Sequence, residues 1–262
     1  SLESELIRAL DNDEFRVYFQ PKYLLDQHVI SGYEALVRWQ SPTRGMVPPD
    51  QFIGLAEQNG LIRQVDATVL KKVCEQIQIW QKQGVDFNKV AVNVSALNFQ
   101  QMEFGKTIHS VVSSYGISPS CLELEITESA MMSDPDQTLA NLNELRSLGF
   151  TIALDDFGTG HSSLGHLKYF PIDRLKIDRT FVKDIDTCDL DKNLVSVTIQ
   201  LAKHLGIKVI AEGVENKTQA YILHVLGCNE VQGFMISKPL PAEEVLPFIQ
   251  ERMAELPDIA LD

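Results

Sequence analysis

The chain has 262 residues, of which 44% are hydrophobic, and its formal net charge is −13. This length suits one large domain, since single α/β barrels commonly reach roughly 250 residues. The negative charge argues against binding to nucleic-acid polymers or to an anionic membrane, because both require a basic surface. We therefore expect a single domain over residues 1–262, in which a bound anion would be met by a few local cations.

The cysteines indicate a reducing compartment. Cys74, Cys121, Cys188 and Cys228 form no C-x-x-C pair and no short spacing to a histidine, which argues against zinc and disulfides. No apolar stretch reaches the roughly 18 residues that cross a bilayer, and no signal peptide is recognisable. Because the sequence begins at Ser1, we expect a fragment of a longer multidomain protein, cytoplasmic or tethered to the inner membrane by missing upstream segments.

Short strand-like runs alternate with amphipathic helix-like stretches along the chain. The runs are rich in Val, Ile, Leu and aromatic residues, and most are short enough for buried parallel strands. Eight runs are recognisable, at residues 16–19, 29–37, 90–94, 122–126, 151–154, 174–177, 208–211 and 230–231. The clearest helical stretches cover residues 66–83, 100–115, 136–148 and 190–205.

The ends of the helices are also marked. Ser133-Asp134-Pro135 and Glu215-Asn216 are typical of helix starts, whereas glycines stand where helices should stop. These glycines are Gly84, Gly116, Gly149, Gly206 and Gly227. Eight strands alternating with helices predict an α/β fold of the (β/α)₈ barrel type.

The first two strands depart from that pattern. Residues 22–28 are too few for a helical crossover, so we predict an antiparallel first strand pair and hence an irregular barrel. Residues 41–49 form a turn-rich insertion, which we expect to cover one end of the barrel without carrying chemistry.

Polar residues lie at the ends of nearly all the predicted strands, where active sites of such barrels are found. They are Glu34, Arg38, Asn93, Ser95, Glu123, Glu125, Glu128, Asp155, Asp156, Lys176, Asp178, Glu212, Glu215 and Gln232. Taken singly, each has an ordinary interpretation: Glu125 facing solvent, Lys176 paired with Asp178, or Glu212 capping a helix. Seven strands with such ends together indicate a converging site.

Asp155 and Asp156 carry the most information. Adjacent carboxylates repel each other, and a buried carboxylate without a partner is costly. Their position between residues 151–154 and the loop Phe157-Gly158-Thr159-Gly160 therefore predicts a bound cation. Oxygen ligands of this kind suit Mg²⁺ or Mn²⁺ rather than zinc.

Two such ions bridged by Asp155 can ionise a water and stabilise a displacement at phosphorus. Lys176 would orient or deprotonate that water, and Arg38 would grip a phosphate oxygen. An alternative is an enolate stabilised on Mg²⁺ by Glu125, Asp155 and Lys176. The adjacent aspartates and Arg38 fit phosphorus chemistry better.

The segment Glu34-Ala35-Leu36-Val37-Arg38 resembles the signature of the EAL-domain family, bacterial phosphodiesterases of cyclic diguanylate (c-di-GMP). The resemblance runs from Phe19-Gln20-Pro21 to Gln232-Gly233-Phe234 and Lys238-Pro239-Leu240, with every motif in order. It implies a modified TIM barrel and a Mg²⁺- or Mn²⁺-dependent phosphodiesterase that converts c-di-GMP to linear diguanylate in bacterial signal transduction.

The resemblance also implies roles for individual residues. Glu34, Asn93, Glu125 and Asp155 would bind a first metal ion, Asp155 and Asp156 a second, with Glu212 and Gln232 in support. Lys176 would position or activate the water, and Glu34, Asp155 and Glu212 would be catalytic together with it. Substrate contacts are implied for Gln20, Leu36, Arg38, Phe234 and Pro239. Glu128 would hold the loop Phe157, Gly158, Thr159 and Gly160, which takes part in dimer contacts in the family.

Departures from the family pattern are small. His161 stands where the family usually has tyrosine, and Met235-Ile236 replaces a more usual Leu-Phe pair. Because no metal-site position is missing, an active enzyme is favoured over the alternative, a c-di-GMP receptor with little or no hydrolysis. We further expect two bound ions, inhibition by Ca²⁺, a homodimer, and GGDEF, regulatory or sensor domains in the full-length protein.

Overall fold

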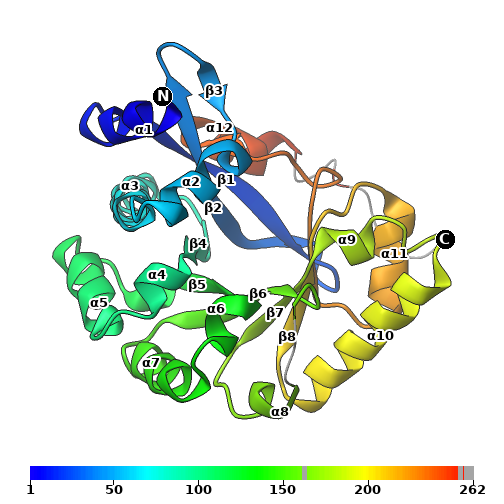
Figure 1. The fold of residues 1–262 in the computed structure, drawn as a ribbon. Helices are drawn as coiled ribbons and strands as arrows, with labels where there is room; N and C mark the ends of the chain where they lie inside the picture. The colour runs from blue at the N-terminus through cyan, green and yellow to red at the C-terminus, as the bar shows by residue number, and fades with distance from the viewer. Residues whose placement is uncertain (161–163, 253–255, 257–262) are drawn as a thin grey trace.

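The protein is a closed barrel of eight strands surrounded by helices (Figure 1). The computed structural model describes residues 1–160, 164–252 and 256. The strands follow one another around the barrel as β1 (Phe15–Leu24), β9 (Glu230–Gln232), β8 (Lys208–Ala211), β7 (Arg174–Ile177), β6 (Thr151–Phe157), β5 (Leu122–Thr127), β4 (Val90–Val94) and β2 (Val29–Ser41). Pairing of β1 with β2 closes the circle, and the short strands β3 (Gly45–Val47) and β10 (Leu240–Pro241) extend the sheet beyond it.

The predicted fold class, including the antiparallel first strand pair, is confirmed. Strand β1 runs antiparallel to β2, with Gln20 opposite Glu34, and it is antiparallel to β9 on its other side. The neighbours from β2 and β4 round to β8 and β9 are parallel. The reversed strand therefore sits at the closing point of an otherwise parallel barrel.

The longer helices pack around the outside of the barrel. They are α3 (Ile62–Gln83), α5 (Phe104–Ser114), α7 (Pro135–Ser147), α10 (Asp189–His204) and α11 (Lys217–Val225). The remaining ones are α1 (Leu2–Asp11), α2 (Pro49–Gln58), α4 (Ala96–Phe99), η1 (Pro119–Cys121), α6 (Glu128–Met132), α8 (Leu164–Leu167), α9 (Arg179–Val182), α12 (Ala242–Pro247) and η2 (Phe248–Arg252). Among all these described helices, none has both the length and the apolar character that crossing a membrane requires.

The predicted helix signals are confirmed at several ends. The Asp134 side chain accepts a hydrogen bond from the backbone N–H of Gln137, and Asn216 does the same for Gln219. Gly84 ends α3 in the left-handed conformation with φ of 68°, where glycine carries no steric penalty.

The structure differs from the predicted elements in the N-terminal half. Helix α1 was not predicted, although its amphipathic spacing buries Leu6 and Ala9 completely. The predicted helix 100–115 begins later than expected, because α5 starts at Phe104, after Glu103, whose φ is 59°. The insertion at residues 41–49 forms a hairpin of β2 with β3 and then enters α2, which begins with Pro49.

The barrel strands separate an apolar outer face from a polar interior. In β5, Leu122, Leu124 and Ile126 are fully buried and alternate with Glu123 and Glu125, which are also buried. Successive side chains of a strand point to opposite faces, so the leucines pack beneath the helices and the glutamates point into the barrel. The apolar core of the described barrel lies in this outer layer. Burial of each large apolar side chain there contributes about 1.5–3 kcal/mol to the free energy of folding.

Candidate active site

The carboxyl ends of the barrel strands carry a dense group of polar side chains. Parallel register aligns them: Asn93 on β4 pairs with Glu125 on β5, and Thr127 on β5 pairs with Asp155 on β6. Because parallel strands all end on the same side of the barrel, side chains far apart in sequence meet at one mouth. Of the residues predicted to converge, the structure brings together Glu34, Asn93, Glu125, Asp155, Lys176, Glu212 and Gln232.

Lys176 on β7 is at the centre of the group. Its fully buried Nζ lies 2.6 Å from Glu125 Oε2 and 2.7 Å from Glu212 Oε1. The same Nζ lies 3.4 Å from Glu34 Oε2 and 3.5 Å from Asp155 Oδ1. One ammonium therefore faces four carboxylates and cannot neutralise them all. A pairing of Lys176 with Asp178 is not what the structure has, since Asp178 caps α9 by accepting a hydrogen bond of 2.8 Å from the N–H of Thr180.

The excess of buried negative charge appears in the pKa values. Burial raises the pKa of Glu34 and of Asp155, and it raises the pKa of Glu212 to about 8. Burial also acts on Glu125, but the ammonium groups of Lys176 and Lys22 outweigh it and lower the pKa of Glu125 to about 2. Burial opposes the charge of Lys176, yet the surrounding carboxylates, Asp155 first, raise its pKa well above the ordinary value.

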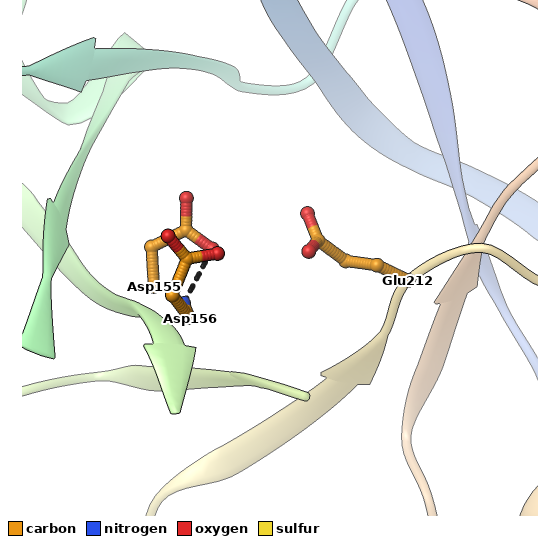
Figure 2. A group of neighbouring side chains, drawn as sticks. All are labelled: Asp155, Asp156 and Glu212. Carbon is orange, nitrogen blue, oxygen red and sulfur yellow. Dashed lines mark hydrogen bonds between the residues drawn. The ribbon is translucent and has the colours of Figure 1, made fainter. Parts of the chain in front are cut away.

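Asp155 and Asp156 present their carboxylates to the same side, towards Glu212 (Figure 2). Oxygen atoms of these three residues lie within 4.8 Å of one another. Adjacent residues of a regular strand point to opposite faces, but Asp156 has φ of 54°, and the β6–β7 register shifts between Leu154 and Phe157. This bulge turns the second carboxylate beside the first. Burial and the neighbouring Asp178 raise the pKa of Asp156.

Side-chain amides complete the group around Glu34. The Asn93 Nδ2 donates to Glu34 Oε1 at 2.9 Å, and the Gln232 Nε2 donates to Glu34 Oε2 at 2.7 Å. Gln232 also donates to Gln20 Oε1 at 2.9 Å, whereas its own Oε1 is buried without a hydrogen-bond partner in the described structure.

The donor set fits a divalent cation. It consists of carboxylate and amide oxygens, and such ligands suit Mg²⁺ and Mn²⁺ better than they suit zinc. A hard cation would neutralise the crowded carboxylates, whose pKa values are raised. It would also give the unpaired oxygen of Gln232 a partner.

An open cavity of about 700 Å³ adjoins this group. Its described lining includes Gln20, Glu34, Leu36, Asp178, Arg179, Thr180, Lys183, Glu212, Gly213, Glu215, Gln232, Gly233 and Phe234. Of the predicted substrate contacts, Gln20, Leu36 and Phe234 are in this lining, whereas Arg38 and Pro239 are not. The Arg38 guanidinium lies 5.6 Å from the Tyr18 ring centroid, and its Nη1 donates to the carbonyl of Val37.

The loop after Asp156 is tied to the barrel mouth by Glu128. The backbone N–H of Gly158 donates to Glu128 Oε2 at 3.2 Å, and Thr159 Oγ1 donates to the carbonyl of Asp156 at 2.7 Å. Gly158 has φ of 94°, and a Cβ there would lie 3.1 Å from the Phe181 ring of α9. Glycine is therefore favoured by the backbone conformation, and a larger residue would have to displace the Phe181 ring slightly. His161 lies outside the described residues.

Three cations of this region were not predicted from the sequence. Arg179 and Lys183 line the cavity and provide the positive charge that Arg38 was predicted to supply there. Lys22 lies inside the barrel, where its Nζ contacts Glu123 and Glu125 at 2.9 and 2.8 Å. The position of Lys22 directly after Gln20-Pro21, on the inward-facing parity of Gln20, was the available signal.

A modified TIM barrel with an oxygen-donor cluster and a buried lysine at its C-terminal mouth defines the class of protein. The family model described as EAL domain matches residues 3–239. The chain belongs to the EAL domain family.

Similar proteins agree with this assignment. The chain is 41% identical over 243 residues to the bifunctional diguanylate cyclase/cyclic di-GMP phosphodiesterase MucR of Pseudomonas aeruginosa, covering 92% of this chain and 35% of that protein. It is 39% identical to the cyclic di-GMP phosphodiesterase PdeR of Escherichia coli, covering 92% and 36%. It thus spans about a third of the length of these relatives. A solved structure described as PaMucR phosphodiesterase in complex with c-di-GMP has a TM-score of 0.89 and 40% identity, covering 93% of this chain and 99% of that one.

Proposed function

We propose that this domain is a metal-dependent phosphodiesterase that hydrolyses c-di-GMP to linear diguanylate. The observation that carries the proposal is the cluster of Asp155, Asp156 and Glu212 oxygens within 4.8 Å, beside a lysine that faces four carboxylates. The names of MucR and PdeR support the substrate, since both are described as acting on cyclic di-GMP.

The proposed ligands follow the geometry of the mouth. Glu34, Asn93, Glu125 and Asp155 would hold one Mg²⁺ or Mn²⁺ ion, and Asp155 with Asp156 would hold a second. Glu212 and Gln232 would support the ions and their water shells. When bound, such ions supply an acidified water and neutralise phosphoryl oxygens in an in-line displacement.

Lys176 supplies a fixed positive charge at the site. Its ammonium is already held in place before substrate binds, because it contacts the carboxylates of Glu125, Glu212, Glu34 and Asp155. It would hold the attacking water and stabilise the negative charge that develops on phosphoryl oxygen.

The cavity offers matching contacts for a cyclic dinucleotide. Arg179 and Lys183 would meet phosphate oxygens, and the Phe234 ring, 58% exposed, gives a flat apolar surface for a guanine base. Gln20 and Leu36 would contact the substrate from β1 and β2. Contacts from Arg38 and Pro239 stay predictions, because neither is among the described lining residues.

We also propose that the domain works as a homodimer in the bacterial cytoplasm. Leu190, Leu194 and Val197 form an exposed apolar row along α10, at the spacing of one helix face. Helix α10 packs against α9, whose Phe181 contacts the loop at Gly158, so a second copy on this row would lie close to the active-site loop. The four cysteines are free thiols, which suits a reducing compartment. GGDEF or sensor domains in the full-length protein stay a prediction.

The test is hydrolysis by the purified protein. With Mg²⁺ or Mn²⁺, chromatography should show c-di-GMP disappearing as linear diguanylate appears, and EDTA should stop the reaction. Tight binding of c-di-GMP without any turnover would instead support the alternative of a receptor domain.

A further inference from the structure

Lys22 lies buried in the interior of the barrel and is not among the described residues that line the cavity. Its side chain is 4% exposed, and its Nζ donates to Glu123 Oε1 at 2.9 Å and to Glu125 Oε1 at 2.8 Å. Strand β1, which carries Lys22, and strand β5, which carries both glutamates, are not neighbours in the sheet, so these contacts cross the barrel.

The lysine belongs to a column of alternating charges along the barrel interior. Arg174 lies 2.5 Å from Glu230 and 3.1 Å from Glu123. Lys22 joins Glu123 to Glu125, and Lys176 joins Glu125 to the cluster at the mouth. Glu125 is therefore the point at which this interior column meets the proposed metal site.

The two oxygens of Glu125 have different neighbours. Oε1 accepts from Lys22 and Oε2 accepts from Lys176 at 2.6 Å. With Oε1 engaged below, only Oε2 faces the acidic cluster, and the plane of the carboxylate is fixed by two opposed charge-assisted hydrogen bonds. Arg174 lies at ion-pair distance from the other oxygen of Glu123, 3.1 Å away, but does not touch Glu125 or Lys22.

We propose that Lys22 is a positioning residue of the active site, which orients Glu125 to offer a single oxygen to a divalent cation. The inference rests on the proposed function, because it assigns Glu125 as a ligand. Groups that orient metal ligands from behind typically change metal affinity by about 10- to 100-fold when removed. Lys22 does not line the substrate cavity in the described structure, so its removal should lower kcat and leave KM for c-di-GMP within about 2-fold.

The experiment compares Lys22→Met, Lys22→Met/Glu123→Gln and Arg174→Met with the unaltered protein. After treatment with EDTA, Mn²⁺ affinity is measured by calorimetric titration and Tm by thermal unfolding without metal. Arg174→Met is the matched control, since it also removes a buried cation that contacts Glu123. It should lower Tm and keep Mn²⁺ affinity within about 2-fold, whereas Lys22→Met should weaken it about 10-fold or more.

The double variant separates positioning from charge balance. It removes one buried positive and one buried negative charge, so its Tm should return towards that of the unaltered protein while its Mn²⁺ affinity stays weak. If affinity and kcat recovered together with Tm, Lys22 would serve only to neutralise Glu123 and the inference would be wrong. Should Lys22→Met fail to fold, the double variant alone decides. Absence of Mn²⁺ binding to the unaltered protein would overturn the proposed function, which is a distinguishable result.

Discussion

The backbone N–H of Asp156 donates a hydrogen bond of 2.8 Å to Oδ1 of the preceding Asp155. The two carboxylates lie on one side of β6 because residue 156 has left-handed backbone geometry, with φ of 54°. Such a conformation costs about 1–2 kcal/mol for a residue other than glycine. Strain of this kind persists where the surrounding structure holds it, and here its effect is to bring two anions together.

Replacing Asp155 by Asn should abolish the function of this pair. The amide retains the shape of the side chain but removes one negative charge from the proposed bridging position. Turnover of c-di-GMP should fall by about 100-fold or more, with weakened Mn²⁺ binding, in a protein whose circular dichroism is unchanged. Asp186→Asn, at an exposed position, is the control and should leave both quantities unaltered. Near-normal rates for Asp155→Asn would contradict the assigned metal role.

The stability of the metal-free protein should fall with rising pH. Burial raises the pKa of Glu212 to about 8, from an ordinary value of 4.5, so between these pH values the folded state holds a proton that the unfolded state has released. The free energy of unfolding should therefore decrease from pH 4.5 to 8 and then level off. Thermal unfolding in EDTA across this range provides the measurement. The Glu212→Gln variant, which has no carboxyl group to titrate, should show a flatter profile, and an equally steep one would contradict the assignment.

Metal binding should release protons in the same pH range. A metal ion requires the ionised carboxylate, so Mn²⁺ affinity should rise as the pH approaches 8. Calorimetric titration in two buffers of different ionisation enthalpy would count the released protons. No proton release near neutral pH would show that Glu212 is already ionised in the free protein.

Gly158→Ala should disturb the loop that follows the aspartates. Alanine there must adopt φ of 94°, and its Cβ would press against Phe181 at 3.1 Å. We expect a loss of about 1–2 kcal/mol in stability from the backbone and a clear fall in kcat from displacement of the loop. Gly206→Ala is matched to it, with φ of 71° but no described atom within 4 Å of the new Cβ. It should lose similar stability and keep its activity, so equal activities of the two variants would exclude a role for the loop.

Calcium should bind to the site without supporting turnover. Ca²⁺ accepts the same oxygen ligands but prefers longer bonds and a larger, looser coordination shell than Mg²⁺. Added Ca²⁺ should therefore inhibit the Mg²⁺-dependent reaction in a manner that excess Mg²⁺ reverses. Fast hydrolysis with Ca²⁺ as the sole metal would argue against the proposed mechanism.

A charge on the exposed row of α10 should weaken the proposed dimer. Leu194 is 44% exposed at the middle of that row, and a glutamate in its place would have to be desolvated at an interface. Light scattering after size exclusion should show Leu194→Glu as a monomer. Ile79→Glu alters a side chain of similar exposure, 45%, on α3 and should leave the dimer intact. A monomeric unaltered protein would rule out the dimer.

Strand positions were accessible from the sequence because they depend on local patterns. Every predicted run coincides with part of an observed strand, and the short connection before β2 correctly indicated antiparallel pairing. Helix α1 escaped prediction because its apolar positions gain their stability only when Leu6 and Ala9 pack against the rest of the chain. The late start of α5 depends on the left-handed backbone conformation of Glu103, which cannot be predicted from the sequence of a residue other than glycine.

The sequence alone determined which acidic residues stand at the ends of strands. Strand positions follow from local patterns, and a parallel sheet places all its strand ends on one side. Only the tertiary structure decided that Lys176 is shared by four carboxylates, that Asp156 turns beside Asp155, and that Lys22 reaches Glu125 across the barrel. The reason is physical: these contacts join residues that barrel closure brings together, and their energies depend on burial and on charges that no local pattern contains.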